Sequence, residues 1–268
     1  MSDQYPHFFS QLGFDFEVLP DDRFVGSASV QPNLCVPGTV MPRPSMLATY
    51  ADIAIGFPAA HRFTFPAPTL DLSMHVFRTP AVADLTMEAK LVKIGKRVIV
   101  GECWFTAQGE VDPYAVCVAT FFTTAEPLGE DWCTPTADNP MFSPTQDLPE
   151  PIAERAGIVT RAPGSVEVTL QPHVSNGTTV QGGIVALLVE RACESALGDG
   201  SDPAGDHVVT GMDLRYLSGL RVGPARATAR VLRSDDGSSH LWVDVTDAGD
   251  DDRMMVHCLA TARPLHAV

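Results

Sequence analysis

The sequence lacks the long apolar run that a membrane-spanning helix needs. No uncharged apolar segment approaches the roughly 18–20 residues that cross a bilayer. Residues 1–7 have neither the basic start nor the apolar core of a signal peptide. We therefore expect a cytoplasmic protein without membrane insertion.

Closely spaced cysteines are also missing. No two of the six cysteines form a Cys-x-x-Cys pair, so the sequence indicates neither a zinc site nor a disulfide framework. We expect reduced, packed thiols and neither a metal site nor a redox cofactor. The six are Cys35, Cys103, Cys117, Cys133, Cys193 and Cys258.

Positive charge is scarce. Eighteen Lys and Arg residues stand against 33 Asp and Glu residues, which gives a formal net charge of −15. That balance argues against nucleic-acid binding, which needs a positive surface. It would also repel a polyanionic ligand at long range, so such a ligand would need a local basic cluster. Five basic residues are the nearest candidates by position for contacts with such a ligand, although each could equally be a solvated surface charge. They are Lys93, Lys96, Arg97, Arg215 and Arg221.

What the sequence does contain is an internal repeat. Val30-Gln31-Pro32 recurs as Leu170-Gln171-Pro172, and Gly38-Thr39 recurs as Gly177-Thr178. Later segments recur in the same order at nearly the same offset, which indicates duplication. We expect two units, residues 1–124 and 151–268, joined by a Pro- and acid-rich linker at 125–150.

Each half has the same pattern of predicted elements. A short helix and two strand-like runs precede a single apolar helix, and strands with period-2 alternation follow. One helix wrapped by an antiparallel sheet, present twice, is an α+β arrangement. The predicted short helices are 8–12 and 152–156, the apolar helices 45–57 and 183–197, and the long strands 85–93, 98–106, 115–123, 211–217, 225–232, 240–245 and 254–262.

A single acid interrupts the first apolar helix. Asp52 is the only charged residue from Pro44 to Ala60. A carboxylate in a buried helix costs several kcal/mol unless it is paired, hydrogen-bonded or protonated. Asp52 is therefore a candidate general base or nucleophile, the alternative being a capping, paired or edge residue. Glu190 takes the same place in the second helix, but its charge is explained equally well if it lies on an ordinary solvent-exposed face of that helix.

The two helices begin differently. The acid lies eight residues after Gly182 in the second copy and eight after Pro44 in the first. Gly182 has a backbone N–H, whereas Pro44 has none. The N–H groups at a helix start bind anions and can stabilise an oxyanion in acyl transfer. Gly182-Gly183 would let a carbonyl approach closely, although paired glycines also form ordinary tight turns.

This frame resembles the PaaI-like acyl-CoA thioesterases, a family with the hotdog fold. That family has an Asn and a Gly, then His-Gly-Gly leading into a central helix with an acid eight residues after the first glycine of the pair. Here Asn176-Gly177 precede Gln181-Gly182-Gly183, with Gln181 in place of the usual His. Residues 212–218 resemble the family's next strand, and Arg43-Pro44-Ser45 stand in place of His-Gly-Gly in the first half.

The resemblance implies a tandem, or double, hotdog fold in which each site takes parts from both halves. One half gives the Asn and the glycine N–H, and the other gives the acid and a Ser or Thr on the following strand. The first site would join Asn176 and Gly182 to Asp52 and Thr69. The second, with Glu190 as its acid, would lack both the amide donor and the hydroxyl, which implies one working and one vestigial site per chain.

The implied function is hydrolysis of a fatty or aromatic acyl-CoA, with coenzyme A only as part of the substrate. Gly182 N–H would polarise the thioester carbonyl, and Asp52 would activate water or attack directly. Thr69 would orient that water or the acid, and Asn176 would order the loop or contact the acyl end of the substrate. Further residues are expected beside the substrate: Arg43, Ser45, Asp71, Gln181 and Gly183.

Alternatives stay open. Residues 69–74 also resemble a strand of the acyl-CoA thioesterase II group, which makes Asp71 a fallback acid, although the Gln expected further along is absent. A hotdog hydratase or dehydratase would need a His at motif spacing, and His61, His173 and His207 do not fall there. The missing motif His also keeps a noncatalytic acyl-CoA or acyl-carrier binder open. Sheet faces and edges leave room for a homodimer of chains.

Overall fold

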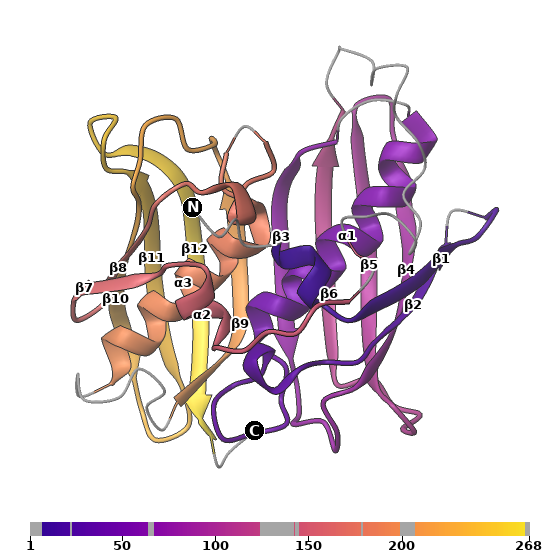
Figure 1. Ribbon diagram of the computed structural model, residues 1–268, viewed down its shortest axis with the longest axis horizontal. Helices are drawn as coiled ribbons and strands as arrows, with labels where there is room; N and C mark the ends of the chain where they lie inside the picture. Colours follow the sequence, from indigo (N-terminus) through magenta and orange to yellow (C-terminus); the bar gives the residue numbers. More distant parts are fainter. Residues whose placement is uncertain are drawn as a thin grey trace.

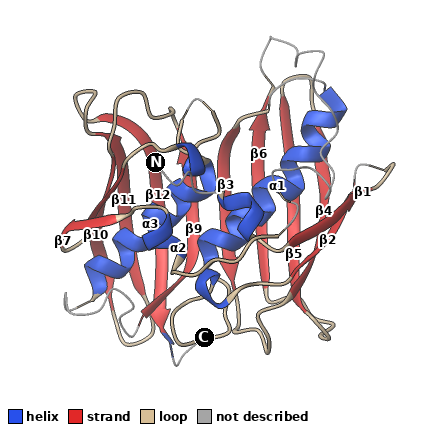
Figure 2. Ribbon diagram, in the orientation of Figure 1, coloured by secondary structure: helices blue, strands red, loops and turns tan. Residues whose placement is uncertain are grey.

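The computed structural model describes residues 7–21, 23–63, 67–123, 142, 145–177, 179–198 and 207–265, except for the side chains of residues 61–63. The described strands form one twelve-stranded antiparallel sheet, and two long helices lie on one face of it (Figures 1 and 2). The predicted α+β combination of antiparallel sheet and few helices is therefore confirmed.

The first half supplies six strands and the longer central helix, α1. Its elements are η1 Phe8–Gln11, β1 Phe14–Val18, β2 Arg23–Ala28, η2 Pro32–Leu34, α1 Pro44–Phe63, β3 Thr69–Val76, β4 Leu85–Ile94, β5 Val98–Ala107 and β6 Ala115–Phe122.

The second half supplies the matching set around α3. Its elements are α2 Ile152–Arg155, β7 Val159–Ala162, β8 Ser165–Val168, η3 Pro172–Val174, α3 Gly182–Leu197, β9 His207–Tyr216, β10 Ala225–Ser234, β11 Ser239–Asp247 and β12 Arg253–Pro264.

The strand order follows the sequence repeat. From one edge the sheet runs β1-β2-β4-β5-β6-β3, and from the other edge it runs β7-β8-β10-β11-β12-β9. The two series meet where β3 pairs with β9 in antiparallel register, with Ser73 opposite Asp213. The two halves are therefore related by an approximate twofold axis at the centre of the sheet. Each residue beside this axis has an equivalent about 140 positions away.

Helix α1 extends beyond its predicted end at residue 57. It runs to Phe63 with Pro58 inside it. A proline in a helix interior lacks the N–H that would donate to the residue four positions earlier. The helix nevertheless continues, since Pro58, Ala59 and Ala60 are all buried and their burial offsets that loss. The end of α1 predicted from the local sequence was therefore too early in the chain.

The helices lie close to the inner face of the sheet. A Cβ placed on Gly101 of β5 would lie 2.3 Å from Cγ2 of Ile55 on α1, so only glycine allows this approach. The inward residues of β4, β5 and β6 alternate with exposed ones, as the period-2 pattern predicted. The core thus lies between the two helices and one face of a continuous sheet.

Much of the predicted linker, including residues 125–141, lies outside the described residues. Where it is described, it packs on the first half: Phe142 stacks on Phe9 with ring centroids 5.4 Å apart. Gln146 N–H donates to Ser10 O at 2.7 Å. No helix in the described ranges combines the length and apolar character needed to cross a bilayer.

Candidate active site

Asp52 lies in the middle of α1 and faces the start of β3. Thr69 Oγ1 donates a hydrogen bond to Asp52 Oδ1 at 2.5 Å. Burial raises the pKa of the Asp52 carboxyl from 3.8 to about 6, and the Thr69 hydrogen bond partly opposes this rise. The carboxyl is therefore a stronger base than an exposed aspartate, and it is largely ionised at neutral pH.

A β-bulge in β3 aims Thr69 at this acid. Thr69 pairs with Phe121, while Asp71 pairs with the adjacent Thr120, so Leu70 is the extra residue. Without the bulge, strict alternation would place Thr69 on the same face as Asp71. With it, Thr69 faces α1 and Asp71 lies on the opposite face of the sheet. The fallback acid is therefore separated from Asp52 by the sheet itself.

The start of α3 is built by Gln181, the residue that replaces the usual His. Its side-chain Oε1 accepts from Gly183 N–H at 2.5 Å and from Ile184 N–H at 3.3 Å, which caps the helix. Gly182 N–H has no hydrogen-bond partner among the described residues, and Gly182 keeps partial exposure. The one unused amide at this helix start thus belongs to the residue expected to polarise a carbonyl.

Gly183 has a packing role that the sequence did not reveal. A Cβ at this position would lie 2.0 Å from Thr49 Oγ1, so the glycine permits α3 to begin against α1. Thr49 lies one helical turn before Asp52. The contact therefore brings the start of α3 close to the turn of α1 that carries the acid.

Tyr216 is a residue of this region that the sequence analysis missed. Its hydroxyl, at the end of β9, donates to Gly182 O at 3.0 Å. Burial raises the pKa of the Tyr216 phenol, and the nearby Asp52 carboxylate raises it further. Tyr216 therefore lies between the acid of one half and the helix start of the other. The repeat could have indicated it: the equivalent residue of the first half, 140 positions earlier, is Val76, so only the second half has a hydroxyl at this position.

Asn176 closes the loop that leads into α3. Its backbone N–H donates to Thr179 O at 3.0 Å, and its Oδ1 accepts from Thr179 N–H at 3.0 Å. Thr179 Oγ1 in turn accepts from Leu220 N–H at 2.6 Å, which ties the loop to the segment after β9. This geometry fits the expectation that Asn176 orders the loop.

The equivalent region across the twofold axis is closed. Arg43 Nη1 donates to Glu190 Oε1 and to Glu194 Oε1, each at 2.7 Å. Glu190 Oε2 also accepts from Ser45 N–H at 3.0 Å. The three charged side chains are at most 3% exposed. Val209 takes the place of Thr69 and is also buried.

These contacts give Arg43, Ser45 and Glu190 structural partners. Burial raises the pKa of Glu194, and Arg43 opposes that rise. Buried charges persist when each is paired and hydrogen-bonded, and here each charged side chain has such a partner, although the Ser45 hydroxyl has none among the described residues. The arrangement leaves Glu190 no open side from which to reach a substrate, which argues against a catalytic role for it.

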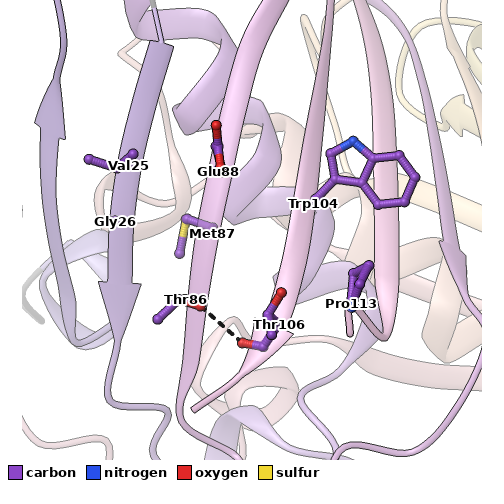
Figure 3. Close-up of a pocket in the computed structure, with 8 residues that line it drawn as sticks. All are labelled: Val25, Gly26, Thr86, Met87, Glu88, Trp104, Thr106 and Pro113. Carbon is purple, nitrogen blue, oxygen red and sulfur yellow. Dashed lines mark hydrogen bonds between the residues drawn. The ribbon is translucent and has the colours of Figure 1, made fainter. Parts of the chain in front are cut away.

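A separate hollow lies on the outer face of the sheet, opposite α1. Figure 3 shows the exposed side chains of Glu88 and Trp104 at this hollow, with Met87 beside them. Glu88 is its one ionisable lining residue, and Arg23 Nη1 pairs with it at 3.3 Å. The hollow therefore lacks the groups that acyl-transfer chemistry needs.

Within the described residues, no three His, Cys, Asp or Glu side chains gather closely enough to hold a metal ion. The five described cysteines are buried free thiols, and Cys133 lies outside the described residues. Of the histidines weighed for a hydratase, His61 lies in α1 with an undescribed side chain, and His173 is buried with Nε2 3.1 Å from Arg155 O.

Comparison with known proteins identifies the fold. No family model and no curated protein matches the chain by sequence. Among solved structures, acyl-CoA thioesterase II of Mycobacterium marinum is 14% identical with a TM-score of 0.54, over 96% of this chain and 97% of that one. The 12:0-ACP thioesterase of Umbellularia californica is 10% identical with a TM-score of 0.62, over 92% and 99%.

A third similar structure is a protein of unknown function with a hotdog fold from Alicyclobacillus acidocaldarius. It is 12% identical, with a TM-score of 0.57 over 97% of this chain and 98% of that one. At these identities the likeness concerns the fold alone. The chain has the hotdog fold.

Proposed function

We propose that this chain is a double-hotdog thioesterase of the PaaI-like kind that hydrolyses an acyl thioester at one composite site. The observation that carries the proposal is the Asp52 carboxyl. It lies half-buried on an apolar helix, its pKa is raised to about 6, and Thr69 holds it by a hydrogen bond. An unpaired acid is costly to keep there, so its retention favours a chemical role.

The second half contributes the electrophilic part of the proposed site. Gly182 N–H, at the positive end of α3, would donate a hydrogen bond to the thioester carbonyl oxygen and stabilise its negative charge in the transition state. Tyr216 would hold the Gly182 carbonyl and so fix the orientation of this turn. The site thus needs both halves, since neither contains the acid and the free amide together.

The reaction follows from these positions. Asp52 takes a proton from water as the water oxygen bonds to the carbonyl carbon. The resulting oxyanion is stabilised by Gly182 N–H and collapses with cleavage of the carbon–sulfur bond. The thiolate then leaves and takes up the proton held by Asp52, which gives a carboxylic acid and a thiol. Direct attack by the Asp52 carboxylate, followed by hydrolysis of the anhydride, is the variant of this route.

We further propose one working site per chain. At the equivalent position the glutamate is neutralised by Arg43, the helix begins with Pro44, and Val209 replaces the hydroxyl. Each of these features removes one requirement of the mechanism. The second position would then contribute to stability and not to turnover.

The test is steady-state hydrolysis of short, medium, long and aromatic acyl-CoA thioesters, followed by thiol release. Wild type is compared with Asp52→Asn and with Glu190→Gln. We expect Asp52→Asn to abolish turnover while retaining thioester binding, and Glu190→Gln to retain turnover per folded molecule. Circular dichroism gives the folded fraction of each variant.

Two outcomes would contradict this scheme. If folded Glu190→Gln alone loses turnover, the working site is the one that contains Glu190. Wild-type protein that is stabilised by a thioester but hydrolyses no member of the panel would be a binding protein.

A further inference from the structure

The basic residues that are free of ion pairs in the described part of the first half cluster on one hairpin. Lys93, Lys96 and Arg97 lie in and beside the turn between β4 and β5, all exposed. Arg97 extends over the Phe122 ring, 4.8 Å from its centroid. Within the described ranges none of the three forms an ion pair, whereas Lys90, further along β4, pairs with Glu102 at 3.0 Å.

This hairpin lies at the end of the sheet where the proposed site is. Thr69 pairs with Phe121 of β6, which pairs with Ile99 of β5. Thr123 N–H donates to Arg97 O at 2.8 Å, which fixes the hairpin against the end of β6. Two strand spacings separate Thr69 from β5, a distance of about 10 Å across the sheet. β3, β6 and β5 lie side by side in Figure 1.

The twofold repeat supplies an internal comparison. The equivalent hairpin joins β10 to β11 and lies beside the closed position, because Val209 pairs with Ala262 and Ala262 with Ser239. There Asp235 and Asp236 take the places of Gly95 and Lys96. The hairpin beside the proposed site thus carries three basic residues and no acid, whereas the equivalent one carries Arg233 together with Asp235 and Asp236. A solvation role would apply equally to both hairpins and does not explain this difference.

We infer that the β4–β5 hairpin binds the phosphates of a coenzyme A thioester, with Lys96 and Arg97 as its main contacts. The inference rests on the proposed function and specifies the carrier of the acyl group. A net charge of −15 repels a polyanionic substrate at long range, so its binding needs a local basic cluster such as this one. The phosphates of coenzyme A supply the compact negative charge that Lys and Arg recognise best.

The experiment compares one acyl group on coenzyme A and on pantetheine, which lacks the nucleotide phosphates. The test variant is Lys96→Gln with Arg97→Gln, and the matched control is Arg230→Gln with Arg233→Gln on β10. Both double variants change the net charge by the same two units, so long-range repulsion is equal. Isothermal titration with coenzyme A alone measures binding without turnover.

In the test variant alone, we expect kcat/KM for the coenzyme A ester to fall roughly tenfold, through a higher KM and an unchanged kcat. Turnover of the pantetheine ester should not change, and coenzyme A binding should weaken by the same factor. The difference between test and control variants should shrink with added salt.

The outcomes separate the two proposals. Equal losses in both double variants, or equal losses on both esters, overturn the hairpin assignment and leave the thioesterase proposal standing. A loss confined to the same acyl group on an acyl carrier protein also overturns it. If wild type hydrolyses neither ester but its coenzyme A affinity still depends on Lys96 and Arg97, the hairpin assignment stands and the proposed function fails.

Discussion

Replacing Asp52 with asparagine is expected to stabilise the protein at pH 8 while it removes turnover. Folding raises the pKa of this carboxyl from 3.8 to about 6, so the folded state holds its proton more tightly than the unfolded state does. The free energy of unfolding therefore falls as pH rises through the window from about 4 to about 6. Above that window the cost of the buried charge is fully present.

The magnitude follows from the two pKa values. At about 1.4 kcal/mol for each tenfold change, the wild type loses about 1 kcal/mol by pH 4.5 and about 3 kcal/mol by pH 8. Asparagine does not titrate, and its side-chain oxygen can still accept from Thr69. The stability advantage of Asp52→Asn should therefore grow by up to about 2 kcal/mol between these pH values.

The assay is urea unfolding of both proteins at pH 4.5 and pH 8, with the free energy taken by linear extrapolation. Asp71→Asn makes the same chemical change on the opposite face of the sheet and controls for the loss of one surface charge. A variant that is less stable than wild type by the same amount at both pH values would refute the argument. It would mean that the Asp52 carboxyl is solvated or paired in the folded protein.

Four further substitutions test the site. Thr69→Val removes the hydrogen bond that lowers the pKa of Asp52, so the rising limb of kcat/KM against pH should move from about 6 to higher pH. Tyr216→Phe should lower kcat by roughly tenfold with little change in KM, because the Gly182 turn loses its anchor. Arg43→Met should cost about 3–5 kcal/mol of unfolding free energy, since it leaves buried carboxylates unpaired. Asp52→Glu should lower turnover although it keeps the acid, measured as kcat per folded molecule.

The repeat allowed much of the fold to be predicted from sequence. Period-2 alternation located the long strands, and the isolated charge at Asp52 made it the candidate acid, a role that stays a prediction. The bulge at Leu70 was not predictable, because a bulge is set by pairing with β6 and leaves no local residue signature. Without it, the alternation of β3 would have placed Thr69 on the outer face.

The ion pairs that close the second position could not be predicted from the sequence either. The sequence showed the substituted motif, but it placed Arg43 beside the substrate and gave no sign of its buried ion pairs. Its partners, Glu190 and Glu194, are 147 and 151 residues away, so only the tertiary structure brings them together. The same holds for Gly183, whose packing against Thr49 depends on how the two helices cross.

The two acids differ in length, and in the structure only the longer one binds the start of the opposite helix. Glu190 is long enough to reach across to the start of α1, where its Oε2 accepts from Ser45 N–H at 3.0 Å. Asp52 is one methylene shorter, and at the start of α3 the Gln181 side chain accepts from the equivalent amide, Gly183 N–H. Gln181 and not the acid thus occupies the start of α3, and Gly182 N–H stays unused. By this reasoning Asp52→Glu reproduces the closed arrangement, in which the acid itself takes the helix start. Undiminished turnover of that variant would mean that side-chain length is not what keeps the site open.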